Sequence, residues 1–95
     1  NIDLIKDIEK DIYIGYCIST VNANLIGEID SLFVHSQYRK LGLGDELMKR
    51  ALEWLDSNNV KGKKIAVAEG NEGVLDFYKR YGFYKRQMIL QQIKE

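Results

Sequence analysis

The spacing of apolar residues changes from strand-like to helix-like across one glycine-rich stretch, and this change limits which folds the chain can adopt. Residues 12–34 contain two runs rich in β-branched and aromatic side chains, separated by a short asparagine-containing connection. Residues 43–55 instead repeat apolar side chains three or four positions apart, as on one face of a helix. Because the stretch from Arg39 to Gly44 lies between the two patterns, we predict a strand, a glycine-rich loop and an amphipathic helix in direct succession.

Together with the remaining segments, this strand, loop and helix give the predicted element order β-β-β-α-β-α-β. Short turns join the first three strands, which predicts an antiparallel meander, and the asparagines of the 22–24 connection tolerate left-handed backbone. The expected fold class is therefore α+β, a mixed and mostly antiparallel sheet flanked by helices. The expected strands are 2–8, 12–21, 25–34, 64–69 and 83–93, and the expected helices are 43–57, ended by Asn58 and Asn59, and 74–81, with Asn71 as N-cap and Gly82 after its end.

Length and composition indicate one ordinary globular domain over residues 1–95. The chain is 45% hydrophobic, which is enough for a core, and it has 14 basic and 14 acidic residues. This balance gives no electrostatic reason to expect nucleic acid or a membrane surface as a partner. Cys17 is the one cysteine, so no disulfide can form within the chain. With no apolar run of the roughly 20 residues that span a bilayer, we expect a cytoplasmic protein.

The stretch Arg39-Lys40-Leu41-Gly42-Leu43-Gly44 has the composition of a phosphate-binding loop. A helix start presents unpaired N–H groups and a partial positive charge, and glycine lets an anion approach the backbone. The dinucleotide fingerprint requires a third glycine where Leu47 stands, and a P-loop requires a Gly-Lys-Ser/Thr ending that is absent. The pattern Arg-x-x-Gly-x-Gly remains, either as a pyrophosphate loop or as a turn that merely starts a helix.

Three segments together resemble the GNAT superfamily of acetyltransferases. The loop matches that family's pyrophosphate motif, and residues 27–35 (Gly-Glu-Ile-Asp-Ser-Leu-Phe-Val-His) resemble its fourth strand. Residues 71–83 resemble its Asn…Phe-Tyr-x-x-x-Gly-Phe segment. The resemblance runs from about residue 2 to residue 93. Members of the family carry a first strand and two helices before the point that matches Asn1, so the resemblance implies an N-terminally shortened, acetyl-CoA-binding core that lacks one wall of the acceptor site.

The resemblance also implies which residues hold acetyl-CoA, the co-substrate. Backbone groups of the strand would pair with the pantetheine arm, and loop amides would bind the pyrophosphate. Asn71 would contact pantetheine or cap the second helix, and a backbone N–H near Val34 would stabilise the developing oxyanion. No metal is expected. The implied cofactor-binding residues are Leu32, Phe33, Val34, Arg39, Lys40, Leu41, Gly42, Leu43, Gly44, Asn71 and Tyr78.

Two catalytic residues are implied by the same resemblance. Tyr78 matches the family tyrosine that protonates the departing thiolate, and a phenol with a pKa near 10 suits a thiol near 8.5. Glu28 matches the catalytic glutamate of the histone-acetylating branch. Asp30 lies two residues further along the strand, and water is a third candidate for the base. At helical spacing, Tyr78 is alternatively a core residue, and Glu28 is alternatively a solvated edge acid.

We expect an N-acetyltransferase that moves the acetyl group of acetyl-CoA directly to a primary amine. The alternative is a non-catalytic acyl-CoA-binding module, or an incomplete half of an acetyltransferase. The acceptor is left open among protein N-termini, lysines, polyamines, aminoglycosides and amino acids. A core without its first elements leaves sheet edge and apolar surface uncovered, so a partner subunit, such as a second copy in a homodimer, is also expected.

Overall fold

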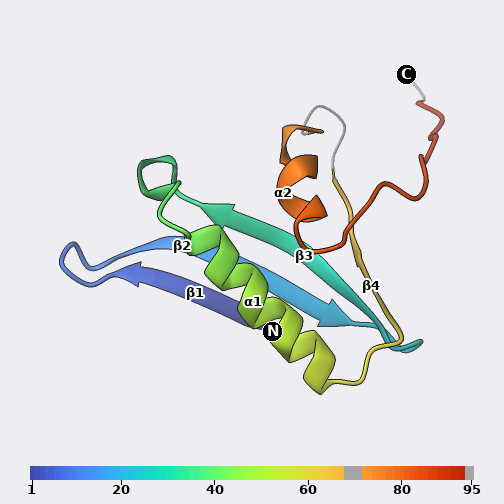
Figure 1. Cartoon of the computed structure of the whole chain (residues 1–95), viewed down its shortest axis with the longest axis horizontal. Coiled ribbons are helices and arrows are strands. Elements are labelled where there is room, and N and C mark those ends of the chain that lie inside the picture. The colour runs from blue at the N-terminus through green and yellow to red at the C-terminus, as the bar shows by residue number, and fades with distance from the viewer. Residues whose placement is uncertain (68–71, 94–95) are drawn as a thin grey trace.

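The computed structural model describes residues 1–67 and 72–93, which form one sheet with helices packed beside it (Figure 1). The strands lie side by side in chain order, β1-β2-β3-β4. The elements are β1 (Ile2–Asp7), β2 (Ile12–Val21), β3 (Ile26–Val34), the 3-10 turn η1 (Ser36–Tyr38), α1 (Leu43–Ser57), β4 (Gly62–Ile65), the 3-10 turn η2 (Glu72–Val74) and α2 (Leu75–Lys79).

The sheet is mixed and mostly antiparallel, as the sequence predicts. β1, β2 and β3 form the antiparallel meander, whereas β4 runs parallel to β3. A parallel pair needs a long crossover connection, and α1 provides it across one face of the sheet (Figure 1). The register of the parallel pair begins with Ile26 opposite Gly62 and ends with Ile29 opposite Ile65. Beyond that pair, β3 stays paired with β2 on one side and has no described strand on its other side.

One face of α1 and one face of the sheet make the core. The buried side of the helix consists of Leu47, Met48, Ala51 and Leu55, which the helical spacing predicts. It packs on Cys17, Ile29 and Val34 of the sheet. At Gly27 the helix comes so close to β3 that an added Cβ would lie 2.6 Å from Cδ2 of Leu55. The close approach fixes α1, and therefore the loop that precedes it, against β3.

The connection between β2 and β3 differs from the sequence expectation. The left-handed residue is Leu25, with φ of 61°, and not an asparagine. The side chain of Asn22 explains this, since its Oδ1 accepts the N–H groups of Asn24 and Ile26 at 2.9 and 3.0 Å. The turn is thus held by a side-chain cap, which fixes a backbone conformation that leucine seldom adopts.

α2 covers Leu75–Lys79, so it is shorter than the predicted helix 74–81, and the predicted Gly82 lies in the turn that follows it. Gly82 is left-handed, with φ of 85°. Its N–H donates to the carbonyl of Lys79 at 3.0 Å, and the N–H of Phe83 donates to that of Tyr78 at 3.2 Å. These two bonds form a Schellman motif, which only a residue tolerant of positive φ completes without strain. The predicted N-cap, Asn71, lies outside the described residues.

Two predicted strands need correction. β4 covers 62–65, so it starts two residues before the predicted 64–69 strand and ends at Ile65, and residues 68 and 69 are outside the described part. Residues 83–93 form no strand, because no described segment lies beside them to complete a ladder. Phe83 is partly buried against the core, and the apolar side chains beyond it are exposed: Tyr84, Met88, Ile89, Leu90 and Ile93. Among the residues that the structure describes, no helix has the length and apolar character needed to cross a membrane.

Candidate functional site

The loop from Arg39 to Gly44 joins η1 to α1 in a tightly wound backbone. Lys40 and Gly42 are both left-handed, with φ of 70° and 77°. Gly42 is the N-cap of α1, and no side chain caps the helix there. A Cβ on Gly42 would meet nothing within 4 Å, so the space beside it is open. The first turn of α1 therefore faces an open region with unpaired N–H groups, which is the geometry expected of an anion site.

A cavity of about 670 Å³ opens at this loop and collects most of the predicted cofactor-binding residues. Its walls come from the end of β3, the loop, the start of α1, and α2. Leu41 is not among its lining residues and is 67% exposed. The predicted residues that do line it are Leu32, Phe33, Val34, Arg39, Lys40, Gly42, Leu43, Gly44 and Tyr78.

One wall of this cavity is the edge of β3 that has no strand beside it among the described residues. The N–H of His35 donates to the carbonyl of Ile14 at 2.7 Å, so position 35 points its backbone groups toward β2. Because these directions alternate along an antiparallel ladder, Phe33 also turns its backbone toward β2. Leu32 and Val34 turn theirs the other way, where the β4 register has already ended. Their backbone groups can receive an extended ligand as a neighbouring strand would.

Arg39 ties the loop to this strand. Its Nε donates to the carbonyl oxygen of Val34 at 3.1 Å, in a partly buried contact. The arginine of the phosphate-loop pattern therefore uses one of its donors on the protein itself. This contact holds the loop beside the end of β3. The predicted pantetheine contacts on β3 and the predicted pyrophosphate contacts in the loop therefore keep a fixed position relative to each other.

Gly44 has a different role from the one that the sequence suggests. A Cβ there would lie 3.4 Å from Cζ of Phe77, at the close limit of ordinary contact. The glycine thus lets the Phe77 ring of α2 pack on the first turn of α1. The missing side chain at Gly44 serves helix-to-helix contact, whereas Gly42 supplies the left-handed backbone and the open space.

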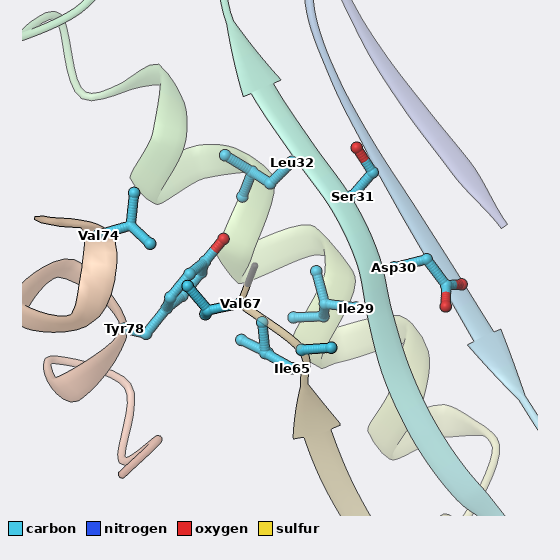
Figure 2. Close-up of a pocket in the computed structure, with 9 residues that line it drawn as sticks. Ile29, Asp30, Ser31, Leu32, Ile65, Val67, Val74 and Tyr78 are labelled. Atoms are coloured by element: carbon cyan, nitrogen blue, oxygen red, sulfur yellow. The ribbon is translucent and has the colours of Figure 1, made fainter. Parts of the chain in front are cut away.

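Tyr78 projects from α2 into the gap between β3 and β4 (Figure 2). It lines both the large cavity and a smaller one of about 200 Å³ in that gap. Phe77 packs edge-on against its ring, with 5.3 Å between centroids. Burial raises the pKa of the Tyr78 phenol above its ordinary value of 10.0, and ionisation of the nearby Cys17 thiol would raise it further. The phenol therefore stays protonated throughout the neutral range and can donate a proton.

The two candidate bases lie on β3, and Asp30 is among the residues that line the smaller cavity with Tyr78. Figure 2 shows the Asp30 side chain on the opposite side of β3 from the tyrosine, and its Oδ2 accepts the Thr20 hydroxyl at 2.7 Å. Glu28 lines neither cavity. Its Oε1 lies 3.5 Å from Nζ of Lys64, the residue opposite it on β4. Both carboxylates are thus engaged with neighbouring side chains.

Sequence reasoning missed a small polar cluster between the two helices. The Tyr81 hydroxyl donates to Oδ1 of Asp45, in the first turn of α1. Nη2 of Arg80 lies 3.0 Å from the same carboxylate oxygen. Tyr81 and Asp45 are 36 positions apart, and no local pattern of the sequence reveals a contact across that separation.

A mixed sheet with a helix-initiating glycine loop beside a strand edge is the arrangement expected of a GNAT-type acetyltransferase. The family model for the "Acetyltransferase (GNAT) family" matches residues 4–83. The chain therefore belongs to the GNAT acetyltransferase family, as its sequence motifs predict.

Individual relatives agree with this assignment. An uncharacterised N-acetyltransferase of Methanocaldococcus jannaschii is 29% identical over 72 residues, covering 76% of this chain and 32% of the relative. A solved protein of Deinococcus radiodurans, named as an acetyltransferase, superposes with a TM-score of 0.76 at 25% identity, covering 96% of this chain and 59% of that one.

An aminoglycoside N-acetyltransferase solved with CoA has a TM-score of 0.73 at 14% identity, covering 88% of this chain and 60% of that one, which shows a shared fold. The chain thus spans about a third of the curated relative, at 32%, and about three fifths of the two solved chains, at 59% and 60%.

Proposed function

We propose that the protein is an N-acetyltransferase that moves the acetyl group of acetyl-CoA directly to a primary amine. The observation that carries this proposal is the single cavity that joins the glycine loop, the edge of β3 and Tyr78. Family membership supports acetyl transfer in general, and the CoA bound by the aminoglycoside acetyltransferase supports the same co-substrate here.

The residues of the cavity fit acetyl-CoA along its length. The open N-terminus of α1 beside Gly42 suits the pyrophosphate, and Lys40 adds a cation. The backbone groups of Leu32 and Val34 suit the amides of pantetheine. The N–H of Val34 would then donate to the carbonyl oxygen of the thioester as that oxygen becomes negative.

The proposed reaction transfers two protons. The amine forms the new C–N bond with the acetyl carbon, and the C–S bond breaks. The departing thiolate takes the Tyr78 hydroxyl proton, which the raised pKa keeps in place at neutral pH. The amine proton passes to Glu28, with Asp30 and water as alternatives. Because the side chains of Asp30 and Tyr78 lie on opposite sides of β3, an amine proton accepted by Asp30 and the thiolate proton given by Tyr78 would move on different sides of the strand.

A thiol-release assay with acetyl-CoA and a panel of amines tests this function, alongside calorimetry with CoA on the same protein. Binding with turnover of at least one amine is the expected result. Binding of CoA without turnover of any amine would instead support an acyl-CoA-binding module. No binding by the folded protein would contradict both. The assay belongs on the longest native form, because the chain covers only 59–60% of the two solved relatives, and a missing acceptor wall would also prevent turnover.

A further inference from the structure

Three cationic side chains from two distant segments line the large cavity. Arg39 and Lys40 come from the loop before α1, and Arg80 comes from the turn that follows α2. The family motif of the loop accounts for the first two. It gives no role to Arg80, which the packing of α2 on α1 brings to the same cavity.

Arg39 is partly committed to the protein. Since its Nε already donates to the carbonyl of Val34, this guanidinium anchors the loop to β3. Its charge and its other N–H donors remain, so Arg39, Lys40 and Arg80 together supply the positive charge at the start of α1.

Arg80 is held in a defined position. Its Nη2 lies 3.0 Å from Oδ1 of Asp45. Its guanidinium carbon lies 4.8 Å from the centroid of the Phe77 ring and 5.8 Å from that of Tyr81. Asp45 in turn accepts the Tyr81 hydroxyl. Two aromatic rings and one carboxylate thus fix the guanidinium opposite the first turn of α1.

The contact between Arg80 and Asp45 is better explained by ligand binding than by a contribution to folding stability. The side chains of Arg80 and Asp45 are 56% and 48% exposed, and ion pairs that exposed contribute little to folding. A guanidinium has five N–H donors, so donors remain after the contact with Asp45, and their planar fork matches phosphate oxygens. Asp45 also lines the cavity, where its charge would repel a phosphate unless a cation offset it.

We propose that Arg80 binds the pyrophosphate of the cofactor and that Asp45 is the residue that positions it. This inference rests on the proposed function, since it assumes that the cavity receives CoA. It adds a ligand from α2 to a phosphate site that the family motif places entirely in the loop and the start of α1.

Calorimetry with three ligands tests the role of Arg80. CoA carries a pyrophosphate and a 3′-phosphate, dephospho-CoA keeps only the pyrophosphate, and pantetheine has neither. We expect Arg80→Gln to weaken CoA and dephospho-CoA by the same factor, about tenfold or more, and to leave pantetheine unchanged. Arg80→Lys should recover part of the loss, because it keeps the charge without the fork. Lys79→Gln is the matched control, since Lys79 is the last residue of α2, directly before Arg80, pairs with Asp76 and does not line the cavity.

The outcomes are separable. Equal CoA affinity of Arg80→Gln and the wild type would overturn the inference and leave the proposed function intact. A loss of affinity for CoA alone would assign Arg80 to the 3′-phosphate and would also overturn the inference. A loss of affinity for pantetheine as large as that for CoA would indicate a purely structural role for Arg80 and would overturn the inference as well. If Arg80→Gln does not fold, judged by thermal unfolding, Arg80→Lys decides, and wild-type affinity for dephospho-CoA in that variant contradicts the proposal. Failure of the wild type to bind CoA would instead overturn the proposed function itself.

Discussion

The hydroxyl of Tyr81 donates a hydrogen bond to Oδ1 of Asp45 and so joins α2 to the first turn of α1. Two further links are the Phe77 ring, packed on Gly44, and the ion pair of Arg80 with Asp45. α2 has five residues, and a helix this short depends on tertiary contacts for its stability. The position of Tyr78 relative to the phosphate loop therefore depends on these contacts.

Removal of the Tyr81 hydroxyl should loosen α2. Tyr81→Phe keeps the ring and deletes one hydrogen bond to a carboxylate, so we expect the free energy of unfolding to fall by about 1 kcal/mol. For a domain of this size the melting temperature should then fall by about 4–8 °C. Tyr84→Phe is the control, since Tyr84 is 66% exposed and should change stability by less than about 0.5 kcal/mol. Thermal unfolding with equal melting temperatures for the two variants would contradict the role given to this bond.

The close approach of α1 to β3 predicts a large effect at Gly27. In Gly27→Ala the new methyl group would lie 2.6 Å from Cδ2 of Leu55, which is fully buried and cannot move aside freely. Overpacking of this kind costs about 1–3 kcal/mol. Gly62→Ala is matched to it, because its new methyl group would meet Ile26 at an ordinary 3.7 Å. Gly27→Ala should therefore unfold at a lower urea concentration than Gly62→Ala. Equal urea midpoints would show that the core around Leu55 can accommodate the added methyl group.

The elements that the sequence predicts well are those fixed by local chemistry. The buried face of α1 follows from helical spacing, and the end of α2 follows from Gly82, because both depend on residues a few positions apart. Residues 83–93 have the apolar content of a strand, but a strand exists only beside a partner, which composition cannot supply. For the same reason, the sequence does not reveal that Arg80 and Arg39 share a cavity.

A charge test at Gly42 separates anion binding from backbone geometry. Asparagine and aspartate have nearly the same size and both tolerate the left-handed backbone that Gly42 adopts, so Gly42→Asn and Gly42→Asp should be strained to a similar extent. They differ in charge beside the proposed pyrophosphate site. We expect Gly42→Asp to bind CoA at least about tenfold more weakly than Gly42→Asn, with the difference shrinking at high salt. Equal calorimetric affinities would place the pyrophosphate away from this loop.

Acid stability should depend on the contact between Asp7 and Tyr38. The Tyr38 hydroxyl donates to Oδ2 of Asp7, and this bond, together with backbone donors, holds the pKa of that carboxyl below its ordinary 3.8. A lowered pKa in the folded state gives stability that is present above pH 3.8 and is lost as the pH falls through the folded-state value. Tyr38→Phe should therefore melt below the wild type at pH 6, and the gap should narrow as the pH approaches 2. A gap that stays constant with pH would rule out the titration of Asp7 as its cause.

The most direct test of the proposed function is the acetyl-transfer rate of Tyr78→Phe, measured with the longest native form and an amine that the wild type accepts. The substitution keeps the ring between β3 and β4 and removes the hydroxyl, so CoA affinity should change by less than about 1 kcal/mol. The account predicts that kcat falls about 10²–10⁴-fold, the range for a positioned acid. Because the pKa of Tyr78 is raised, wild-type activity should decline only above pH 10, and this decline should be absent from the variant. A Tyr78→Phe enzyme that transfers acetyl groups at the wild-type rate would show that Tyr78 is a packing residue and would contradict the account.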